Sequence, residues 1–311
     1  MSVGWGQDCG EGYVWIDEIY NYFDEPISNT NCFYQSDLDV LQILIDNSSE
    51  TINMDMDIDS SGFIEPLELG GQDWLDGRLI QLKSEGGGFS GLIPTQIGSL
   101  TGLEELNLSD NQLTGVIPQQ IGSLENLYEL SFGGCQLSGD IPVEICQLIQ
   151  LESFELDGNE LTGEIPDCIG ELILLEDFVI ENNYLTGSIP EIIGDLENLV
   201  ELDFGNNQLS GEIPENICNI MYVGLSDNQL CPPYPECLSE EDIGYQDTSE
   251  CFECSETNGD INNDNILNIL DIVSTVNCIL SDNCNECSDM NGDEIIDILD
   301  IVLMVNDIMD I

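Results

Sequence analysis

A 24-residue pattern repeats five times without a gap between Ile97 and Asn216. The copies share leucine at one matching position, namely Leu103, Leu127, Leu151, Leu175 and Leu199. A fixed period of this length indicates a solenoid of stacked coils, each of which contributes one slice of a shared core. Because a single coil cannot bury its apolar side, the solenoid needs neighbouring coils and a cap at each end.

A short strand is expected in each copy, because the segment LxL alternates inward and outward residues with a period of two. An asparagine follows the strand in four copies, and its side chain is expected to satisfy backbone groups of the turn. These residues are Asn111, Asn159, Asn183 and Asn207. Cys135 takes this place in the second copy, where we expect a buried, unpaired thiol.

The combined pattern, LxxLxLxxN followed by LTGxIPxxIGxL, resembles the plant-type leucine-rich repeat over about 120 residues. The resemblance implies an α/β solenoid, right-handed, with five full 24-residue coils plus caps, which we place at residues 73–238. Trp74 to Gln96 matches the repeat loosely and is expected to form the N-terminal cap. After Asn216 a shortened sixth coil ends in CPPYPEC, whose prolines stop further strand pairing.

The outward positions of the repeat strands are expected to form the concave face of the solenoid, and most of them are acidic. They are Glu104, Glu105, Tyr128, Glu129, Glu152, Glu155, Glu176, Asp177, Glu201 and Asp203. Such faces bind partners in repeat proteins, so Glu105, Glu129, Asp177 and Glu201 are candidate partner-binding residues. The partner would be cationic or bridged through calcium, and the alternative is a solvated acidic face without a ligand.

The charge balance restricts the possible functions. The 311 residues include 63 Asp and Glu but only two basic residues, Arg78 and Lys83, and no His. This excludes Ser-His-Asp and Cys-His catalysis and any basic surface for nucleic acid. Chemistry by a carboxylate pair stays formally open, but we predict that the protein is not an enzyme. The formal net charge of −61 opposes folding, so we expect bound cations to stabilise the fold.

A calcium-binding loop is predicted inside a helix-plus-loop segment at residues 34–72. A short amphipathic helix, capped by Ser36 or Asp37, precedes the loop. The loop has EF-hand-like spacing, with Gly62 at the sharp turn, and an acidic turn that matches by chance is the alternative. The predicted ligands are Asp57, Asp59, Ser61, Phe63 through its carbonyl, Glu65 and Glu68. Arg78 and Lys83 are expected to bind carboxylates of this loop or of the first coil.

A second duplication, with a period of 29 residues, occupies the C-terminal region. Each copy carries a loop with oxygen ligands and then an apolar helix. The predicted ligands are Asp260, Asn262, Asp264, Ile266, Asn268 and Asp271 in the first copy, and Asp289, Asn291, Asp293, Ile295, Asp297 and Asp300 in the second. Asn265 and Glu294 stand where glycine is usual, and glutamate tolerates such a turn less well. With the loop at 57–68, the sequence predicts three Ca²⁺ sites.

The tandem loops resemble the dockerin module, because each ends in Asp at the twelfth place and no helix precedes it. We therefore assign residues 258–311 to a small all-α dockerin-like domain. The resemblance implies two loop–helix units related by a pseudo-twofold axis that dock onto a cohesin, and no cohesin is visible in this chain. It also implies partner contact by the pairs Ile269-Leu270 and Ile298-Leu299, whose apolar character suits a buried interface.

Thirteen cysteines indicate an oxidising compartment, and hence a secreted, extracellular or cell-surface protein. The preferred pairs are Cys9–Cys32 and Cys146–Cys168. The eight cysteines after Asn216 have open connectivity, and structural disulfides are favoured over zinc there.

The remaining segments carry weaker signals. Residues 1–33 form an aromatic and cysteine-containing extension, and residues 239–257 a cysteine-containing linker. No apolar run reaches the length of a membrane span, and Met1–Gly10 lacks the plan of a signal peptide. Asn47 and Asn107 lie in glycosylation sequons.

Together these features predict a secreted, non-enzymatic, calcium-stabilised protein for adhesion or assembly. In one version the dockerin-like C-terminus docks to a neighbouring copy and builds an extracellular filament or lattice. In the alternative, the protein docks to a cohesin-bearing scaffold and presents its concave face to a ligand. The acidic charge favours the first version, because like-charged copies would associate only in the presence of calcium.

Overall fold

The structure, a computed structural model, describes residues 9–16, 31–57, 62–248, 251, 259, 267–281, 288, 290 and 295–309. The chain divides into two compact units, Met1–Thr248 and Ser249–Ile311, and each is considered by itself.

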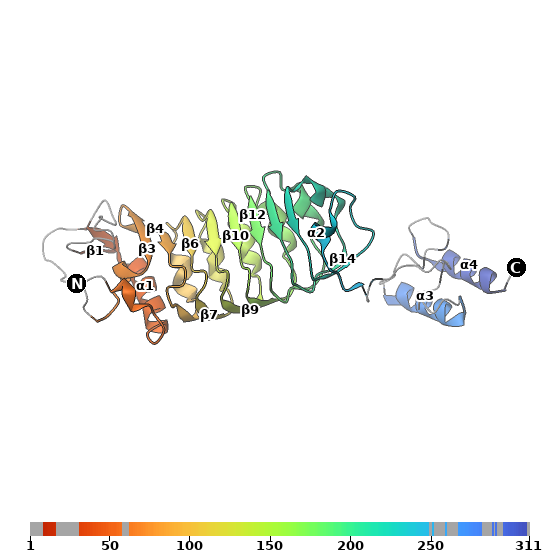
Figure 1. The fold of residues 1–311 in the computed structure, drawn as a ribbon, viewed down its shortest axis with the longest axis horizontal. Coiled ribbons are helices and arrows are strands. Elements are labelled where there is room, and N and C mark those ends of the chain that lie inside the picture. The colour runs from red at the N-terminus through yellow and green to blue at the C-terminus, as the bar shows by residue number, and fades with distance from the viewer. Residues whose placement is uncertain are drawn as a thin grey trace. The chain divides into compact units, whose positions relative to one another are not determined.

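An eight-stranded sheet runs along the repeat region of the first unit, with the coils stacked in chain order (Figure 1). Its strands are β3 (Gly71–Leu75), β4 (Arg78–Lys83), β6 (Glu105–Asn107), β8 (Glu129–Ser131), β10 (Ser153–Glu155), β12 (Asp177–Val179), β13 (Glu201–Asp203) and β15 (Tyr222–Gly224). All neighbours are parallel except β3 and β4, which form an antiparallel pair. The expectation of short parallel strands is therefore confirmed.

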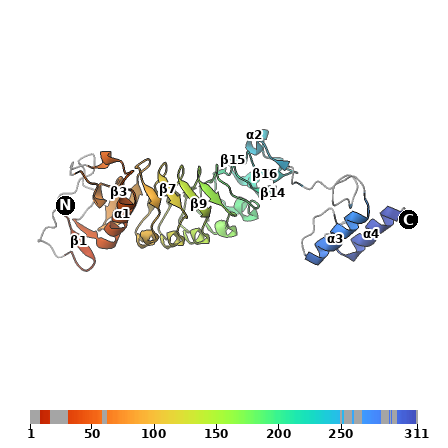
Figure 2. The ribbon, with the colours of Figure 1, turned by 90° about the horizontal axis from the view of Figure 1, so that it is seen from below.

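The rest of each coil contains further short strands and 3₁₀ helices. The strands are β5 (Ser90–Leu92), β7 (Gln112–Gly115), β9 (Gln136–Asp140) and β11 (Glu160–Thr162) in one sheet, and β14 (Ser210–Glu212) and β16 (Gln229–Cys231) in another; Figure 2 shows β7 and β9 side by side. The 3₁₀ helices are η3 (Thr95–Ser99), η4 (Gln119–Ser123), η5 (Val143–Gln147), η6 (Asp167–Glu171), η7 (Glu191–Asp195) and η8 (Glu215–Asn219). Each follows a proline, which fixes φ at the start of the turn. In the described coils, the helical part of the expected α/β solenoid thus consists of 3₁₀ helices.

The core is a continuous stack of leucine, isoleucine and phenylalanine side chains from successive coils. Phe154 and Phe178 stack with ring centroids 5.4 Å apart, and Phe178 meets Phe204 edge-on at 5.0 Å. Each of these rings is fully buried. Because every ring contacts the coil above or below, burial couples neighbouring coils rather than stabilising each coil alone.

The asparagine prediction is confirmed, and Asn159 shows the geometry. Its Oδ1 accepts the N–H of Leu137 at 2.9 Å, and its Nδ2 donates to the carbonyls of Phe132 and Leu156 at 2.9 and 3.0 Å. Equivalent bonds link the other coils at Asn111, Asn183, Asn207 and Asn228. Cys135 is a buried free thiol that donates to Leu108 O at 3.5 Å, as expected, and burial raises its pKa.

At the N-terminal end, an antiparallel strand pair and a helix precede the expected cap at Trp74–Gln96 and extend it. β1 (Tyr13–Trp15) pairs antiparallel with β2 (Cys32–Tyr34), and α1 (Gln35–Asn47) follows directly. The prediction that Ser36 or Asp37 caps this helix is wrong, because Tyr34 is the N-cap residue and has no side-chain cap bond. Asp37 instead lies fully buried, and its carboxylate binds Arg78 Nε at 2.8 Å and the N–H of Leu79 at 3.0 Å.

The C-terminal cap extends further than the sequence suggested. α2 (Glu240–Ile243), capped by Ser239, continues the backbone hydrogen bonding of the last coil, since Leu225 N donates to Asp242 O. Gln246 then takes the role of the next ladder asparagine: its Oε1 accepts the N–H of Leu230, and its Nε2 donates to Leu225 O. The linker expected at 239–257 therefore does not begin at 239, because residues 239–247 belong to the cap.

Disulfides reinforce the first unit. Both predicted pairs are present, with Cα atoms 5.5 Å apart in Cys9–Cys32 and 5.8 Å apart in Cys146–Cys168. A third bridge joins Cys218 and Cys237, and Cys231 is also disulfide-bonded. No helix in the described ranges is long and apolar enough to cross a membrane.

The second unit contains α3 (Ile269–Ser281) and α4 (Ile298–Met309) among its described residues. The 29-residue duplication makes Thr275 and Met304 equivalent positions, and Thr275 Oγ1 lies 3.3 Å from Met304 Sδ. The pseudo-twofold relation of the two loop–helix units stays a prediction.

Candidate functional site

The outward side of the eight-stranded sheet, hereafter the repeat face, carries the predicted partner-binding carboxylates in one row. Strand register aligns Glu105, Glu129, Ser153, Asp177 and Glu201 as successive Cα partners. Neighbouring strands lie about 4.8 Å apart, so like charges in this row repel one another. The structure therefore brings Glu105 and Glu129 together, and Asp177 and Glu201 together, on either side of Ser153.

One internal cation lies at the N-terminal end of this row. Lys83 Nζ forms an ion pair with Glu105 and lies 3.8 Å from Glu129 Oε2. Glu105 is buried, and it also accepts a hydrogen bond from the hydroxyl of Tyr128 at 3.2 Å. The prediction that Lys83 binds a carboxylate of the first coil is confirmed. The same prediction is wrong for Arg78, whose guanidinium binds Asp37 of α1.

A second group of carboxylates lies further along the repeat face. Partial burial raises the pKa of Glu155, Asp157 and Glu181, and neighbouring carboxylates raise these values further. For Asp157 these neighbours are Asp110 and Asp203, which belong to other coils. The two basic side chains of the protein are engaged elsewhere, so this group has neither of them as a counter-ion.

Ser131 lies under this group, on the outward side of β8. Its Cα partners in the neighbouring strands are Asn107 and Glu155. Ser131 is 1% exposed. The hydroxyl lies close enough to the Glu155 carboxylate to lower the pKa of that group and so offset part of the rise that burial causes.

Two glycines make room for the carboxylates beside Ser131. A methyl group at Gly133 would collide with Oδ1 of Asp157, and one at Gly134 would collide with Oδ1 of Asp110. Gly134 also has a φ of +65°, which disfavours other residues. Sequence reasoning found Glu155 and Asp203 from the strand alternation but missed Ser131, Asp157 and Glu181. The last two lie beyond the strand, where the period of two no longer applies.

The predicted N-terminal metal loop is described in part, because Asp59 and Ser61 lie outside the described residues. Asp57 follows η1 (Met54–Met56), and its Oδ2 accepts the N–H of Gly62, whose φ is +88°. Glu65 and Glu68 form a reciprocal capping box around η2 (Pro66–Glu68).

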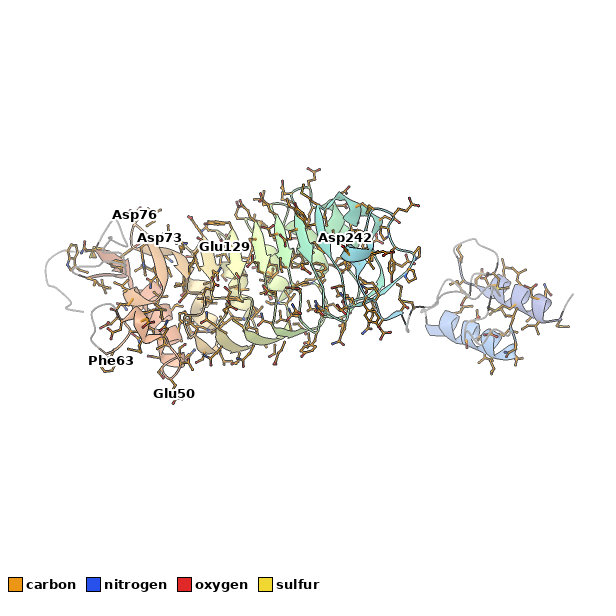
Figure 3. The ribbon with its side chains drawn as sticks, viewed as in Figure 1. Glu50, Phe63, Asp73, Asp76, Glu129 and Asp242 are labelled. Atoms are coloured by element: carbon orange, nitrogen blue, oxygen red, sulfur yellow. A yellow bond between two sulfur atoms is a disulfide. The ribbon has the colours of Figure 1, made fainter. Side chains whose placement is uncertain are left out.

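Phe63, the predicted backbone ligand of this loop, has a side chain that is 76% exposed. In Figure 3, Phe63 and Glu50 lie on the opposite side of the molecule from Asp73 and Glu129. The loop is therefore remote from the repeat face, and it remains a predicted calcium site.

In the second unit, the predicted ligands that are described cap the helices. Asp271 and Asp300 are fully buried, and each accepts the backbone N–H three residues before it, from Asn268 and Asp297, at 2.8 Å. Asn268 and Asp297 in turn accept the second N–H of α3 and α4. Ile295 is exposed. The ligands Asp260, Asn262, Asp264, Ile266, Asp289, Asn291 and Asp293 lie outside the described residues.

Matching apolar pairs open α3 and α4. Ile269 and Ile298 are 68% and 70% exposed, and Leu270 and Leu299 are 58% and 55% exposed. Equal exposure at positions 29 residues apart means that both copies present the same surface. The predicted pairs are thus accessible in this unit.

Comparisons with known proteins fit this geometry. The sequence profile of the Leucine Rich Repeat family matches residues 102–124, 126–148, 150–172 and 198–220. The structure of PEPR1-AtPEP1 is 32% identical with a TM-score of 0.57, covering 65% of this chain and 29% of that chain. The Arabidopsis receptor kinase HAESA, in complex with the peptide hormone IDA and the co-receptor SERK1, is 37% identical with a TM-score of 0.49, covering 50% and 26%.

The ectodomain of the receptor kinase SOBIR1 from Arabidopsis thaliana is 27% identical with a TM-score of 0.45, and the match covers 56% of this chain and 94% of that chain. The chain spans less than a third of the length of the PEPR1 and HAESA structures. A search of the curated proteins found no match. The protein contains leucine-rich repeats, stacked as a solenoid of parallel strands.

Proposed function

We propose that this protein is an extracellular, non-enzymatic interaction protein, stabilised by calcium, that attaches through its C-terminal unit and presents its repeat face to a second protein. The observation that carries the proposal is the duplicated apolar surface of Ile269-Leu270 and Ile298-Leu299. Four large apolar side chains, each more than half exposed on so small a unit, are typical of an interface that is covered in use. In this proposal the unit acts as a dockerin-like module.

The charge of the C-terminal unit supports bound calcium. Residues 249–311 include no Lys, Arg or His, although Asp300 is fully buried. A buried carboxylate is costly unless a counter-charge or hydrogen bonds compensate it. The N–H groups of Met290 and Asp297 supply two hydrogen bonds to Asp300, and a Ca²⁺ ion in the loop before each helix would supply the charge.

The proposed role of the repeat face is supported by its acidity and by the likeness to PEPR1-AtPEP1, whose TM-score is 0.57. Carboxylates of four coils, namely Glu105, Glu129, Asp177 and Glu201, lie in register on one surface. A cationic protein would find complementary charge there, which speeds association and selects the partner. Disulfides in the repeat unit fit an oxidising, extracellular location.

The docking surface is tested with I269S/L270S, I298S/L299S and the fourfold variant, in 1 mM CaCl₂. The probes are a panel of purified cohesin domains, measured by calorimetry, and the protein itself, measured by sedimentation velocity. The double variant L92S/V116S removes two equally exposed apolar residues from the repeat unit and serves as the control. The fourfold variant should lose association that the control retains. Equal association of all variants would exclude these pairs as the docking surface.

Electron microscopy separates self-assembly from attachment to a scaffold. Regular fibres with calcium that dissolve on addition of EGTA would support docking between neighbouring copies, which is the version that we favour. Monodisperse particles in both conditions would exclude self-assembly and leave a cohesin-bearing scaffold as the partner. The charge of −61 makes calcium dependence an expected feature of any contact between copies.

A further inference from the structure

An apolar patch lies on the N-terminal coils, on the sheet that contains β5 and β7. It consists of Leu92, which is 60% exposed, and Val116, which is 59% exposed. The two residues occupy equivalent places, since each lies between a glycine and Ile-Pro. The later coils carry a polar residue at this place, namely Asp140, Glu164, Ser188 and Glu212. Because β5 and β7 are paired and paired strands lie about 4.8 Å apart, the two side chains form one patch, which ends where the polar residues begin.

The C-terminal end of α1 packs directly beside this patch. Asn47, the last residue of α1, donates from its side-chain Nδ2 to the carbonyl of Leu92 at 3.1 Å. Its own carbonyl accepts the hydroxyl of Ser90 at 3.3 Å, and the side chain of Asn47 is exposed. In Figure 3, Glu50, three residues further on, lies on the opposite side of the molecule from Glu129. A group attached to Asn47 therefore leaves the repeat face open.

Asn47 is also the first residue of the glycosylation sequon Asn47-Ser48-Ser49. Ser49, whose hydroxyl completes the sequon, is exposed. The second sequon differs, because Asn107 is half-buried in β6 and its Oδ1 accepts both the N–H and the O–H of Ser109, at 3.1 and 2.6 Å. A sugar on Asn107 would also stand on the repeat face, beside Glu129. The geometry therefore favours Asn47 as the modified residue.

We infer that Asn47 carries an N-linked glycan whose first sugars cover Leu92 and Val116. This inference rests on the extracellular location that forms part of the proposed function. In the transfer, Asn47 Nδ2 loses one proton and bonds to C1 of the first sugar of a lipid-linked oligosaccharide. The bond from C1 to the pyrophosphate oxygen breaks, and the lipid pyrophosphate leaves with the electron pair.

The contacts of Asn47 direct the attached sugar toward the patch. One N–H remains on Nδ2 after the transfer, and it keeps the hydrogen bond to the carbonyl of Leu92. The first sugar is thereby held next to β5. Its C–H face and acetamido methyl group remove apolar surface of Leu92 and Val116 from water, while its hydroxyls stay in solvent. This explains why the exposed place is apolar in the coils beside Asn47 and polar in the coils beyond them.

The first test locates the attached sugar. The full-length chain is secreted from human cells behind a cleavable signal, and chymotryptic peptides of the protein in the medium are analysed by mass spectrometry with and without peptide N-glycosidase F. Ser49→Ala removes the sequon but leaves Asn47 in place, and Ser109→Ala is the matched control at the other sequon. Glycopeptides that contain Asn47 should appear in the wild type and in S109A and should be absent from S49A.

The possible failures of this test have different meanings. Secreted wild-type protein with an unmodified Asn47 would overturn the inference and leave the extracellular location intact. A chain that stays inside the cells without a glycan would count against both.

The second test asks whether the sugar covers the patch, by a double-mutant cycle on the thermal unfolding midpoint. Loss of the glycan through S49A should lower the midpoint of the wild type by about 2 °C, and that of L92S/V116S by less than about 0.5 °C. The smaller effect is expected because the apolar contact is already missing in the double variant. Equal shifts in the two backgrounds would show that the glycan does not contact Leu92 and Val116, and would overturn the inferred cover.

Discussion

The asparagine ladder yields a stability prediction whose size follows from counting hydrogen-bond partners. In Asn159→Ala the carbonyl of Leu156 keeps a donor, because Asn183 Nδ2 also donates to it at 2.9 Å. The N–H of Leu137 and the carbonyl of Phe132 lose the partner that Asn159 provides. Both residues are fully buried. Each unsatisfied group costs about 1–3 kcal/mol, so Asn159→Ala should lower the free energy of unfolding by about 3 kcal/mol.

Two further variants sharpen this prediction. Asn159→Cys should cost about half as much, because Cys135 shows that a thiol at this position still reaches a carbonyl of the preceding coil. Asn126→Ala is the matched control, since Asn126 donates to Thr101 O at 2.8 Å in an exposed setting where water replaces it. Urea unfolding followed by circular dichroism measures all three. A loss below about 0.5 kcal/mol for Asn159→Ala would show that water reaches the ladder and would refute the reasoning.

Three other outcomes are expected. Chelation by EGTA should lower the thermal unfolding midpoint through lost ligand linkage, and an unchanged midpoint in calorimetry would mean that the predicted calcium loops are empty. The raised pKa values of Glu155, Asp157 and Glu181 mean that the folded state binds protons more tightly than the unfolded state, so stability should fall as pH rises from their ordinary values through the raised ones. Urea titrations from pH 4 to 7 measure this, and E155Q/E181Q should flatten the profile. Asp37→Ala should lower the free energy of unfolding, measured in urea, by about 3 kcal/mol, because it leaves Arg78 without its carboxylate. The double variant D37L/R78M should lower it less. Equal losses for the two variants would show that the unpaired Arg78 is not the cause.

The repeat unit was predictable wherever a feature recurs with the period. Strand positions, the ladder asparagines and the thiol of Cys135 each follow from the place of a residue within one coil. The disulfide Cys146–Cys168 could be predicted for the same reason, because both cysteines lie in equivalent turns of neighbouring coils. Periodicity translates a sequence position directly into a spatial one.

The caps were harder to predict, because their residues act outside the period. Asp37 was read as a local helix cap, yet it contacts Arg78, and that contact depends on how α1 folds back on the first coil. Gln246 closes the ladder with a side chain longer than that of asparagine. It lies in a segment outside the repeat, so the periodic pattern did not predict its role.

The candidate site shows a similar division. Alternation of inward and outward residues found the row that contains Glu105, Glu129, Asp177 and Glu201. It could not show that Lys83 is shared between two coils, nor that Ser131 lies buried beside Glu155. Those properties depend on side-chain packing, which one strand alone does not determine.

Both ends of the stacked coils are closed by structures that differ from a coil. The antiparallel pair β3–β4 terminates the sheet at one end, and α2 with Gln246 occupies the backbone groups at the other. A second molecule that tried to add its own coils would meet a reversed strand, β3, at one end and the helix α2 at the other, in place of a parallel coil strand. The number of coils is therefore encoded in the sequence of one chain rather than set by concentration.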